Sequence, residues 1–257
     1  MKIAHISDFH LRHHLPGESP LAQRRIRLMP QLIRLALAQI TTHQPDLLAI
    51  TGDLVDFPLD AMDDPTAIEL GRKDLLLIRE VFAQAPCPVA YLYGNHDHPA
   101  SYRELFADQA LDRTVGDYRL LTFLDDEVRD NMAERLGDSL NLFSTSLTDA
   151  DPRPQIHLQH YMVFPVQNEG YPHSYREAEQ LHQAVAQSGK IRLSLSGHYH
   201  VGSPLQRQDG VCYATARAFC EAPHPFRVYD LDGESIAETE FYVDPLAANT
   251  ASSTTDP

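Results

Sequence analysis

The sequence predicts an α/β fold built around a sheet that is covered on both faces. Three strand-like segments, 2–7, 46–50 and 88–93, alternate with two helix-like segments over the first hundred residues. The second and third are apolar nearly throughout, a pattern typical of strands buried on both faces. The segments between them carry apolar residues three or four positions apart, as amphipathic helices do. This β-α-β-α-β order predicts crossover helices that join strands of one sheet.

Both predicted helices have a recognisable start. Ser19 and Pro20 fit an N-cap followed by proline in the first turn, and the helical pattern continues from Ile26 to Ile40. Pro30 either starts a second helix or kinks the first. Asp64-Pro65 opens the next helix in the same way.

The pattern is less regular beyond residue 107. We expect further strands at 118–124, 156–164, 191–196, 210–216, 226–231 and 238–243. A helix is expected over 126–136, and Ser174 with Glu177 forms a capping box for a helix ending at Gly189. Since there is no internal repeat or break in composition, residues 1–246 are predicted to form one domain. The small polar residues of 247–257 predict a disordered tail.

Composition and charge narrow the possible partners. The chain has 257 residues, of which 43% are hydrophobic, and a formal net charge of −15. Such a surface repels nucleic-acid backbones and anionic lipid, so neither polymeric nucleic acid nor a membrane is expected to bind. No apolar stretch approaches the roughly 18 residues of a membrane span. The scattered Cys87, Cys212 and Cys220, with a first strand that leaves no room for a secretory signal, predict a cytoplasmic protein.

Polar side chains follow the predicted strands where each strand ends. The residues concerned are Asp8, His10, Asp53, Asn95, His96, Asp97, His198 and His200, with His160 inside strand 156–164. In open α/β sheets, binding sites form at the carboxyl ends of strands, so we expect these side chains to converge.

Seven of these residues have the chemistry of metal ligands. They comprise two carboxylates, one amide and four imidazoles: Asp8, Asp53, Asn95, His10, His160, His198 and His200. Oxygen and imidazole donors in this ratio suit Mn, Fe or Zn better than Mg²⁺ or Ca²⁺. Seven donors are too many for one ion that keeps a position open for substrate. They suit two ions about 3.5–4 Å apart that share a carboxylate.

In this order, the motifs "DFH", "GDLVD", "GNHD", a later isolated histidine and "GHYH" resemble the five blocks of the calcineurin-like metallophosphoesterases. The resemblance spans residues 8–200 and implies a four-layer α/β/β/α sandwich of two mixed sheets flanked by helices. It implies one metal held by Asp8, His10, Asp53 and His200. A second metal would be held by Asp53, Asn95, His160 and His198, so that Asp53 bridges the two.

One ligand departs from the family pattern. His160 stands in the context "QHYMVFP", and His157 is the alternative. His157 should face the other side of the strand if His160 faces the metals.

The resemblance also implies catalytic roles. A hydroxide held by both ions would attack a phosphate ester in line, and His96 would contact the substrate and assist. Asp97 is expected to accept a hydrogen bond from His96, which would fix its tautomer and favour the imidazolium.

The most favoured substrate is a small phosphodiester, with a small phosphomonoester as the alternative. The nearest branch is that of the bacterial cyclic-nucleotide phosphodiesterases, in which arginine commonly follows Asn-His-Asp. Here His98 and Pro99 follow, which disfavours a cyclic nucleotide. The net charge disfavours the repair-nuclease branch. Candidate substrate-binding residues lie in or beside the motif loops: His13, His14, His98, Tyr171, His173 and Arg217.

A non-catalytic interaction module on the same scaffold belongs to a different functional class. Since all seven ligand types and the His96–Asp97 pair are present, we favour an enzyme. Nothing in the sequence predicts an oligomeric state.

Overall fold

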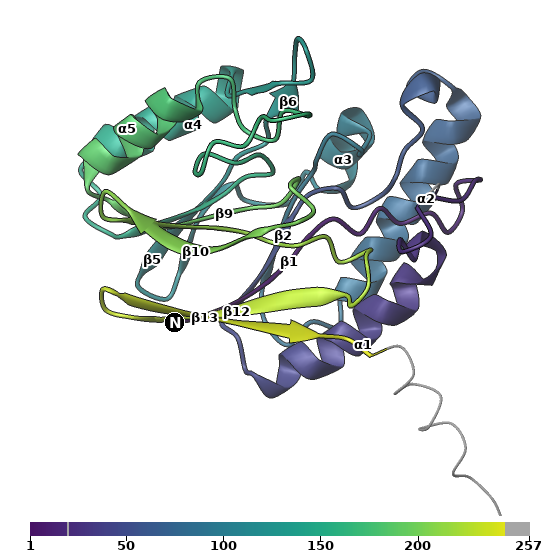
Figure 1. The fold of residues 1–257 in the computed structure, drawn as a ribbon, viewed down its shortest axis with the longest axis horizontal. Coiled ribbons are helices and arrows are strands. Elements are labelled where there is room, and N and C mark those ends of the chain that lie inside the picture. Colours follow the sequence, from purple (N-terminus) through teal and green to yellow (C-terminus); the bar gives the residue numbers. More distant parts are fainter. Residues whose placement is uncertain (20, 245–257) are drawn as a thin grey trace, which may run out of the picture.

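Two β-sheets lie face to face between two layers of helices (Figure 1). The computed structural model describes residues 1–19 and 21–244, so the predicted tail at 247–257 lies outside the described residues. The sheets have the strand orders β13-β12-β1-β2-β3 and β10-β11-β9-β8-β5-β4. Each contains both parallel and antiparallel pairs. The predicted α/β class, with two mixed sheets flanked by helices, is therefore confirmed.

The first sheet takes strands from both ends of the chain. Its strands are β1 (Lys2–Ile6), β2 (Leu47–Thr51), β3 (Val89–Leu92), β12 (Pro225–Asp232) and β13 (Ser235–Tyr242). Beside it lie the helices α1 (Met29–Thr42), α2 (Pro65–Phe82) and α3 (Pro99–Leu105), with the short 3₁₀ helices η1 (Ile26–Leu28) and η2 (Leu59–Ala61).

The second sheet comes from the middle of the chain. Its strands are β4 (Asp112–Val115), β5 (Tyr118–Thr122), β8 (Gln155–Leu158), β9 (Ile191–Ser196), β10 (Ser203–Gln208) and β11 (Val211–Thr215). The helices α4 (Gly137–Thr148) and α5 (Ala178–Ser188) cover its outer face, and a small hairpin is formed by β6 (Asp126–Glu127) and β7 (Ala133–Glu134).

Three apolar layers separate the four structural layers. In β1, Ala4 and Ile6 pack toward α1 and α2, whereas Ile3 packs against the second sheet. A third cluster joins the outer face of the second sheet to α4 and α5. This alternation follows from the period of two along a strand. None of the described helices is both long and apolar enough to cross a membrane.

The predicted helix over 126–136 is wrong. This segment forms the β6–β7 hairpin, and its turn contains Asp130 and Asn131 in left-handed backbone conformations. The Arg135 guanidinium is buried, 3.0 Å from Asp125 Oδ2 and 2.9 Å from the Tyr175 hydroxyl. This long-range pairing outweighs the local helical pattern, and the helix begins only at residue 137.

Three predicted boundaries also need correction. No helix starts at Ser19, whose Oγ accepts a hydrogen bond from the Leu21 N–H; α1 begins at 29, with Pro30 in its first turn. Ser174 Oγ accepts a hydrogen bond from the Gln167 N–H and does not cap α5. The predicted end of α5 at Gly189 is confirmed. The strand predicted over 156–164 ends at 158, because the chain then turns toward the first sheet. The predicted N-cap of α2, Asp64, is confirmed by its bond to the Ala67 N–H.

A polar side chain, His5, is buried between the two sheets. Its Nε2 lies 2.8 Å from Thr51 Oγ1 and its ring centroid 6.0 Å from that of Tyr229. Burial, with a smaller effect from Arg227, lowers the pKa of His5 to about 3. The imidazole therefore stays neutral in the folded protein at pH values where the unfolded chain binds a proton.

We expect His5→Gln to reduce the acid sensitivity of the fold. Since the unfolded His5 binds a proton below about pH 6.5 and the folded one only near its lowered pKa, wild-type stability falls as pH drops through this window. At pH 5 this linkage costs about 2 kcal/mol relative to neutral pH. Urea unfolding of the EDTA-treated proteins at pH 7.5 and 5.0 measures it. An equal loss in wild type and His5→Gln would contradict the prediction.

Candidate metal centre

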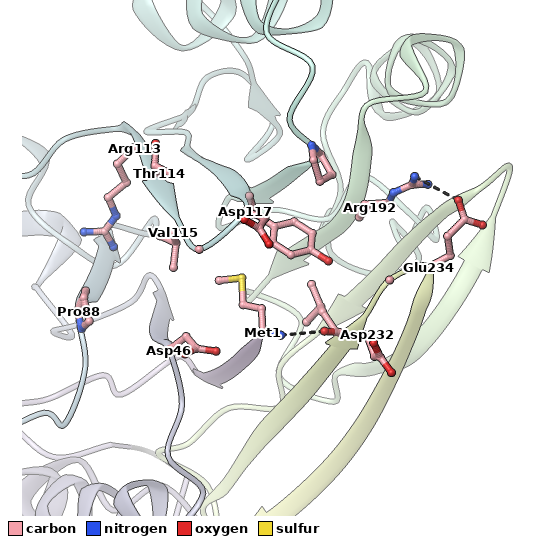
Figure 2. A pocket seen from close by; sticks show the side chains of 15 residues that line it. Met1, Asp46, Pro88, Arg113, Thr114, Val115, Asp117, Arg192, Asp232 and Glu234 are labelled. Carbon is pink, nitrogen blue, oxygen red and sulfur yellow. Dashed lines mark hydrogen bonds and ion pairs between the residues drawn. The ribbon is translucent and has the colours of Figure 1, made fainter.

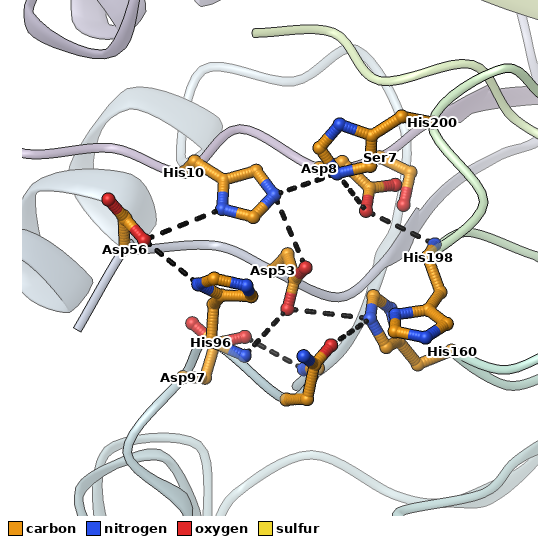
Figure 3. Close-up of polar contacts among 12 residues, drawn as sticks. Ser7, Asp8, His10, Asp53, Asp56, His96, Asp97, His160, His198 and His200 are labelled. Carbon is orange, nitrogen blue, oxygen red and sulfur yellow. Dashed lines mark hydrogen bonds and ion pairs between the residues drawn. The ribbon is translucent and has the colours of Figure 1, made fainter. Parts of the chain in front are cut away.

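The turns after β1, β2 and β9 bring four of the predicted ligands together. One ligand atom from each of Asp8, His10, Asp53 and His200 lies within 4.8 Å of the others (Figure 3). Nε2 of His10 is 3.0 Å from Nε2 of His200 and 3.3 Å from Asp53 Oδ2. The structure thus assembles the residues predicted for the first metal.

A second group lies on the other side of Asp53. Ligand atoms of Asp53, His160 and His198 also lie within 4.8 Å of one another. Nε2 of His160 is 3.4 Å from Asp53 Oδ1 and 3.2 Å from Asn95 Oδ1. Since Asp53 uses Oδ2 toward His10 and Oδ1 toward His160, its carboxylate stands between the two groups.

Strained backbone places several of these side chains. Asp8, His10, Asp53 and His198 have φ values of +57°, +45°, +49° and +66°, a region that side chains with a Cβ rarely adopt. Such strain concentrates at functional sites, where the surrounding structure enforces it. A Cβ at Gly94 would overlap the Asp53 carboxylate, so the turn after β3 needs glycine for a close approach.

Two histidines are oriented through the ring nitrogen that faces away from the cluster. His160 Nδ1 donates to the Thr51 carbonyl at 2.6 Å, and His200 Nδ1 lies 2.9 Å from Glu221 Oε1. With a proton on Nδ1, the lone pair of each ring is on Nε2, the atom that faces the cluster. Metal-binding histidines are held by such bonds.

The charges of the cluster fit a bound cation. Asp8 Oδ2 is buried and has no hydrogen-bond partner among the described residues. Burial works to lower the pKa of His160, but Asp53 raises it to about 9. The imidazoles of His160 and His10 in turn lower the pKa of Asp53 against the effect of its burial. A buried carboxylate demands nearby positive charge, and the oxygen and imidazole donors suit metal ions in that role.

His96 lies next to this cluster, but its partner is not the predicted one. Its Nδ1 is 2.9 Å from Oδ1 of Asp56, whose Oδ2 is 2.8 Å from Arg12 Nε. Burial alone would lower the pKa of His96, but Asp53 and Asp56 raise it, which favours the imidazolium. Sequence reasoning missed Asp56 as a functional residue, although it ends the "GDLVD" motif.

The predicted hydrogen bond between His96 and Asp97 is wrong, because Asp97 instead binds backbone groups of two loops. Its buried carboxylate accepts the backbone N–H groups of Leu54, Val55 and Gly94 at 3.0, 2.9 and 2.8 Å. These bonds occupy both oxygens, and they fix the turn after β2 against the turn after β3. Asp97 therefore supports the site without facing the cleft.

His157, the alternative to His160, lies elsewhere. It is buried with Nε2 3.0 Å from Gln155 Oε1 and its ring centroid 5.0 Å from that of Phe123. Phe123 belongs to the apolar layer between the second sheet and its helices. The structure thus places His160 at the cluster and His157 on the opposite side of the sheet.

A cleft of about 590 Å³ opens over the cluster. Its lining includes Asp53, Asn95, His96, His198 and His200 and, around them, Arg24, Leu59, Glu127, Asn131, Tyr171, His173, Tyr199 and Val201. Two of the candidate substrate-binding residues, Tyr171 and His173, are thus in place. Arg24, Glu127 and Asn131 were missed. Glu127 and Asn131 lie in the β6–β7 hairpin, which was predicted as a helix, and Arg24 lies before α1 in a segment whose path the sequence does not reveal.

The remaining candidates do not line the cleft. His13 and its neighbour His14 are exposed in the loop after β1. His98 Nδ1 accepts the Ser101 N–H and so caps α3. Arg217 pairs with Glu240 at 3.3 Å.

A larger cavity, of about 1000 Å³, lies where the β4–β5 and β12–β13 turns meet (Figure 2). Its charged groups are partly paired, as the Met1 amino group donates to the Leu231 carbonyl and Arg192 lies 3.3 Å from Glu234. None of the metal-ligand groups found among the described residues lies there. The described groups of metal-ligand side chains instead lie at and below the smaller cleft.

Comparisons with known proteins agree with this geometry. A cAMP/cGMP dual specificity phosphodiesterase of Mycobacterium tuberculosis is 26% identical over 229 residues, which cover 82% of this chain and 67% of that protein. A dimetal phosphatase from Danio rerio has a TM-score of 0.66 at 13% identity, covering 95% of this chain and 99% of its own. A purple acid phosphatase from yellow lupin (Lupinus luteus) has a TM-score of 0.62 at 13% identity, covering 94% of this chain and 51% of its own. At such identities the two solved structures show the fold alone.

The profile of the calcineurin-like phosphoesterase family matches residues 1–202. Its match includes every motif from Asp8 to His200, and the chain therefore belongs to this family of phosphate-ester hydrolases.

Proposed function

We propose that this protein hydrolyses a small phosphodiester at two metal ions, with His96 assisting the departure of the leaving group. The observation that carries the proposal is Asp53, whose two oxygens face two separate groups of metal-ligand side chains. The first ion would be held by Asp8, His10, Asp53 and His200. The second would be held by Asp53, Asn95, His160 and His198. Mn, Fe and Zn suit these donors.

Two such ions would supply positive charge for the phosphate oxygens and would lower the pKa of water toward neutrality. The chain itself supplies the proton. Because Asp56 holds His96 Nδ1, the Nε2–H of the imidazolium is the one available to the leaving oxygen. His96 lies among the residues that line the cleft, and Asp97 fixes the turn that carries it.

The cleft supports a diester over a monoester. Its rim presents the exposed apolar side chains of Leu59, Tyr171 and Val201, which suit an uncharged organic ester group. Glu127 adds a carboxylate to the lining and would repel the second negative charge of a monoester. The mycobacterial relative is a phosphodiesterase by name, which favours the same class of ester.

The direct test compares bis(p-nitrophenyl) phosphate with p-nitrophenyl phosphate on protein loaded with Mn²⁺. We expect a higher kcat/KM for the diester. His96→Ala should lower kcat by about 10²–10⁴ and leave the metal content unchanged, because a general acid is lost and the ligands remain. Absence of hydrolysis of both esters after loading with Mn, Fe or Zn would refute the proposal.

Metal content tests the shared carboxylate. We expect Asp53→Asn to lose both ions, since each group then lacks its common charged donor. Equilibrium dialysis against Mn²⁺, followed by elemental analysis, gives the number of ions per chain. The exposed Asp117, at the far cavity, provides the matched control Asp117→Asn. Wild-type metal content in Asp53→Asn would rule out the bridging role.

Asp56 is expected to position His96. Asp56→Asn should lower kcat by about 10–100-fold with little change in KM, because the imidazole of His96 loses its charged partner. Asp56→Glu should recover part of kcat. Steady-state kinetics on the diester measures both variants. A change in KM alone would instead place Asp56 in substrate binding.

A further inference from the structure

Arg24 is a cleft residue that the proposed chemistry does not use. Among the described residues that line the cleft, it is the one arginine, and none of them is a lysine. The described lining also contains the carboxyl groups of Asp53 and Glu127. With a formal net charge of −15, the chain as a whole repels anions, and Arg24 provides local positive charge in the cleft.

Both the backbone and the side chain of Arg24 are held by the segment 220–221. Its backbone forms an antiparallel bridge with Glu221, and the neighbouring Arg25 N–H donates to the Cys220 carbonyl at 2.8 Å. Its Nε also lies 3.0 Å from Glu221 Oε1. A guanidinium fixed in this way loses little conformational entropy when it binds an anion.

Metal ligation would change the hydrogen bonds of Arg24. Nη2 lies 3.0 Å from His200 Nδ1, which is also 2.9 Å from Glu221 Oε1. If His200 binds a metal through Nε2, its Nδ1 carries the proton and donates to Glu221. The ring can then no longer accept from Nη2, so an N–H of Arg24 beside a metal ligand is left for another acceptor.

We infer that Arg24 is a substrate-binding residue, which donates this N–H to a non-bridging phosphate oxygen of the ester. The inference rests on the proposed function, because the ester must lie against His200 and its metal to be in reach. Arginine suits the role, since its planar charged group matches phosphate oxygens. In the diester of the proposed function, the phosphate would contact Arg24 while the uncharged ester groups extend toward the apolar rim.

The alternative is a purely structural role, in which Arg24 only orients Glu221 and, through it, His200. Metal affinity and anion affinity separate the two roles. A structural residue would affect Mn²⁺ binding, whereas a substrate-binding residue would affect the binding of phosphate to the metal-loaded protein.

The experiment titrates inorganic phosphate into Mn²⁺-loaded wild type, Arg24→Gln and Arg24→Lys by calorimetry. A charge-assisted hydrogen bond is lost, so the Kd for phosphate should rise about 10–100-fold in Arg24→Gln. The Kd for phosphate should rise less in Arg24→Lys, because lysine keeps the positive charge but lacks the planar guanidinium with its several N–H donors. The exposed neighbour Arg25 provides the control Arg25→Gln, which should bind phosphate like wild type. The Kd for Mn²⁺ should be unchanged in all variants.

Two outcomes would overturn the inference. One is an unchanged phosphate Kd in Arg24→Gln with both metals retained. The other is loss of Mn²⁺ affinity in Arg24→Gln and Arg24→Lys, which would assign Arg24 the structural role. If the expected phosphate pattern appears in a protein that hydrolyses neither aryl ester, Arg24 binds anions and the proposed function fails. If the diester is hydrolysed while the phosphate Kd is unchanged, the proposed function stands and Arg24 has no part in it.

Discussion

The buried carboxylate of Asp53 is the constraint on which the rest of the structure depends. It is surrounded by imidazoles from both sheets, and a negative charge at such depth is stable only with positive charge beside it. Asp53 and three neighbouring ligands have left-handed backbone conformations, which are tolerated because the two sheets hold the turns in place. Local strain, and an Asp8 oxygen without a hydrogen-bond partner in the described part of the chain, are thus consistent with a site built for cations.

The fold divides the ligands between its two sheets. Turns of the first sheet supply Asp8, His10, Asp53 and Asn95, and segments after β8 and β9 of the second supply the three remaining histidines. Each sheet therefore holds roughly half of a donor set that is complete only when the sheets face each other. The hydrogen bonds of Asp97 to backbone groups of two loops maintain this arrangement within the first sheet.

Much of this could be predicted from the sequence, because ligands at strand ends leave a local signature. The motifs identified Asp53 and the six other ligand side chains that the structure gathers around it, and the apolar segments identified most of the strands that carry them. What failed depends on long-range contacts. His96 pairs with Asp56 and not with Asp97, because the Asp97 carboxylate already accepts three backbone N–H groups. The segment 126–136 has the pattern of a helix, whereas in the structure Arg135 contacts the Tyr175 hydroxyl, forty residues along the chain. No local sequence pattern predicts that Arg24 pairs with Glu221, because the two residues are nearly two hundred positions apart.

Much of the rim of the cleft comes from parts of the chain other than the ligand-bearing turns, although Tyr199 and Val201 lie in the turn that carries His198 and His200. Glu127 and Asn131 belong to the β6–β7 hairpin, Tyr171 and His173 to the loop before α5, and Leu59 to η2. These segments are short connections on the surface, where insertions and replacements are tolerated well. The hydrolytic centre and the selection of its ester can therefore diverge independently: a lineage could exchange the hairpin or the loop and acquire a new substrate, while the buried donors stay as they are.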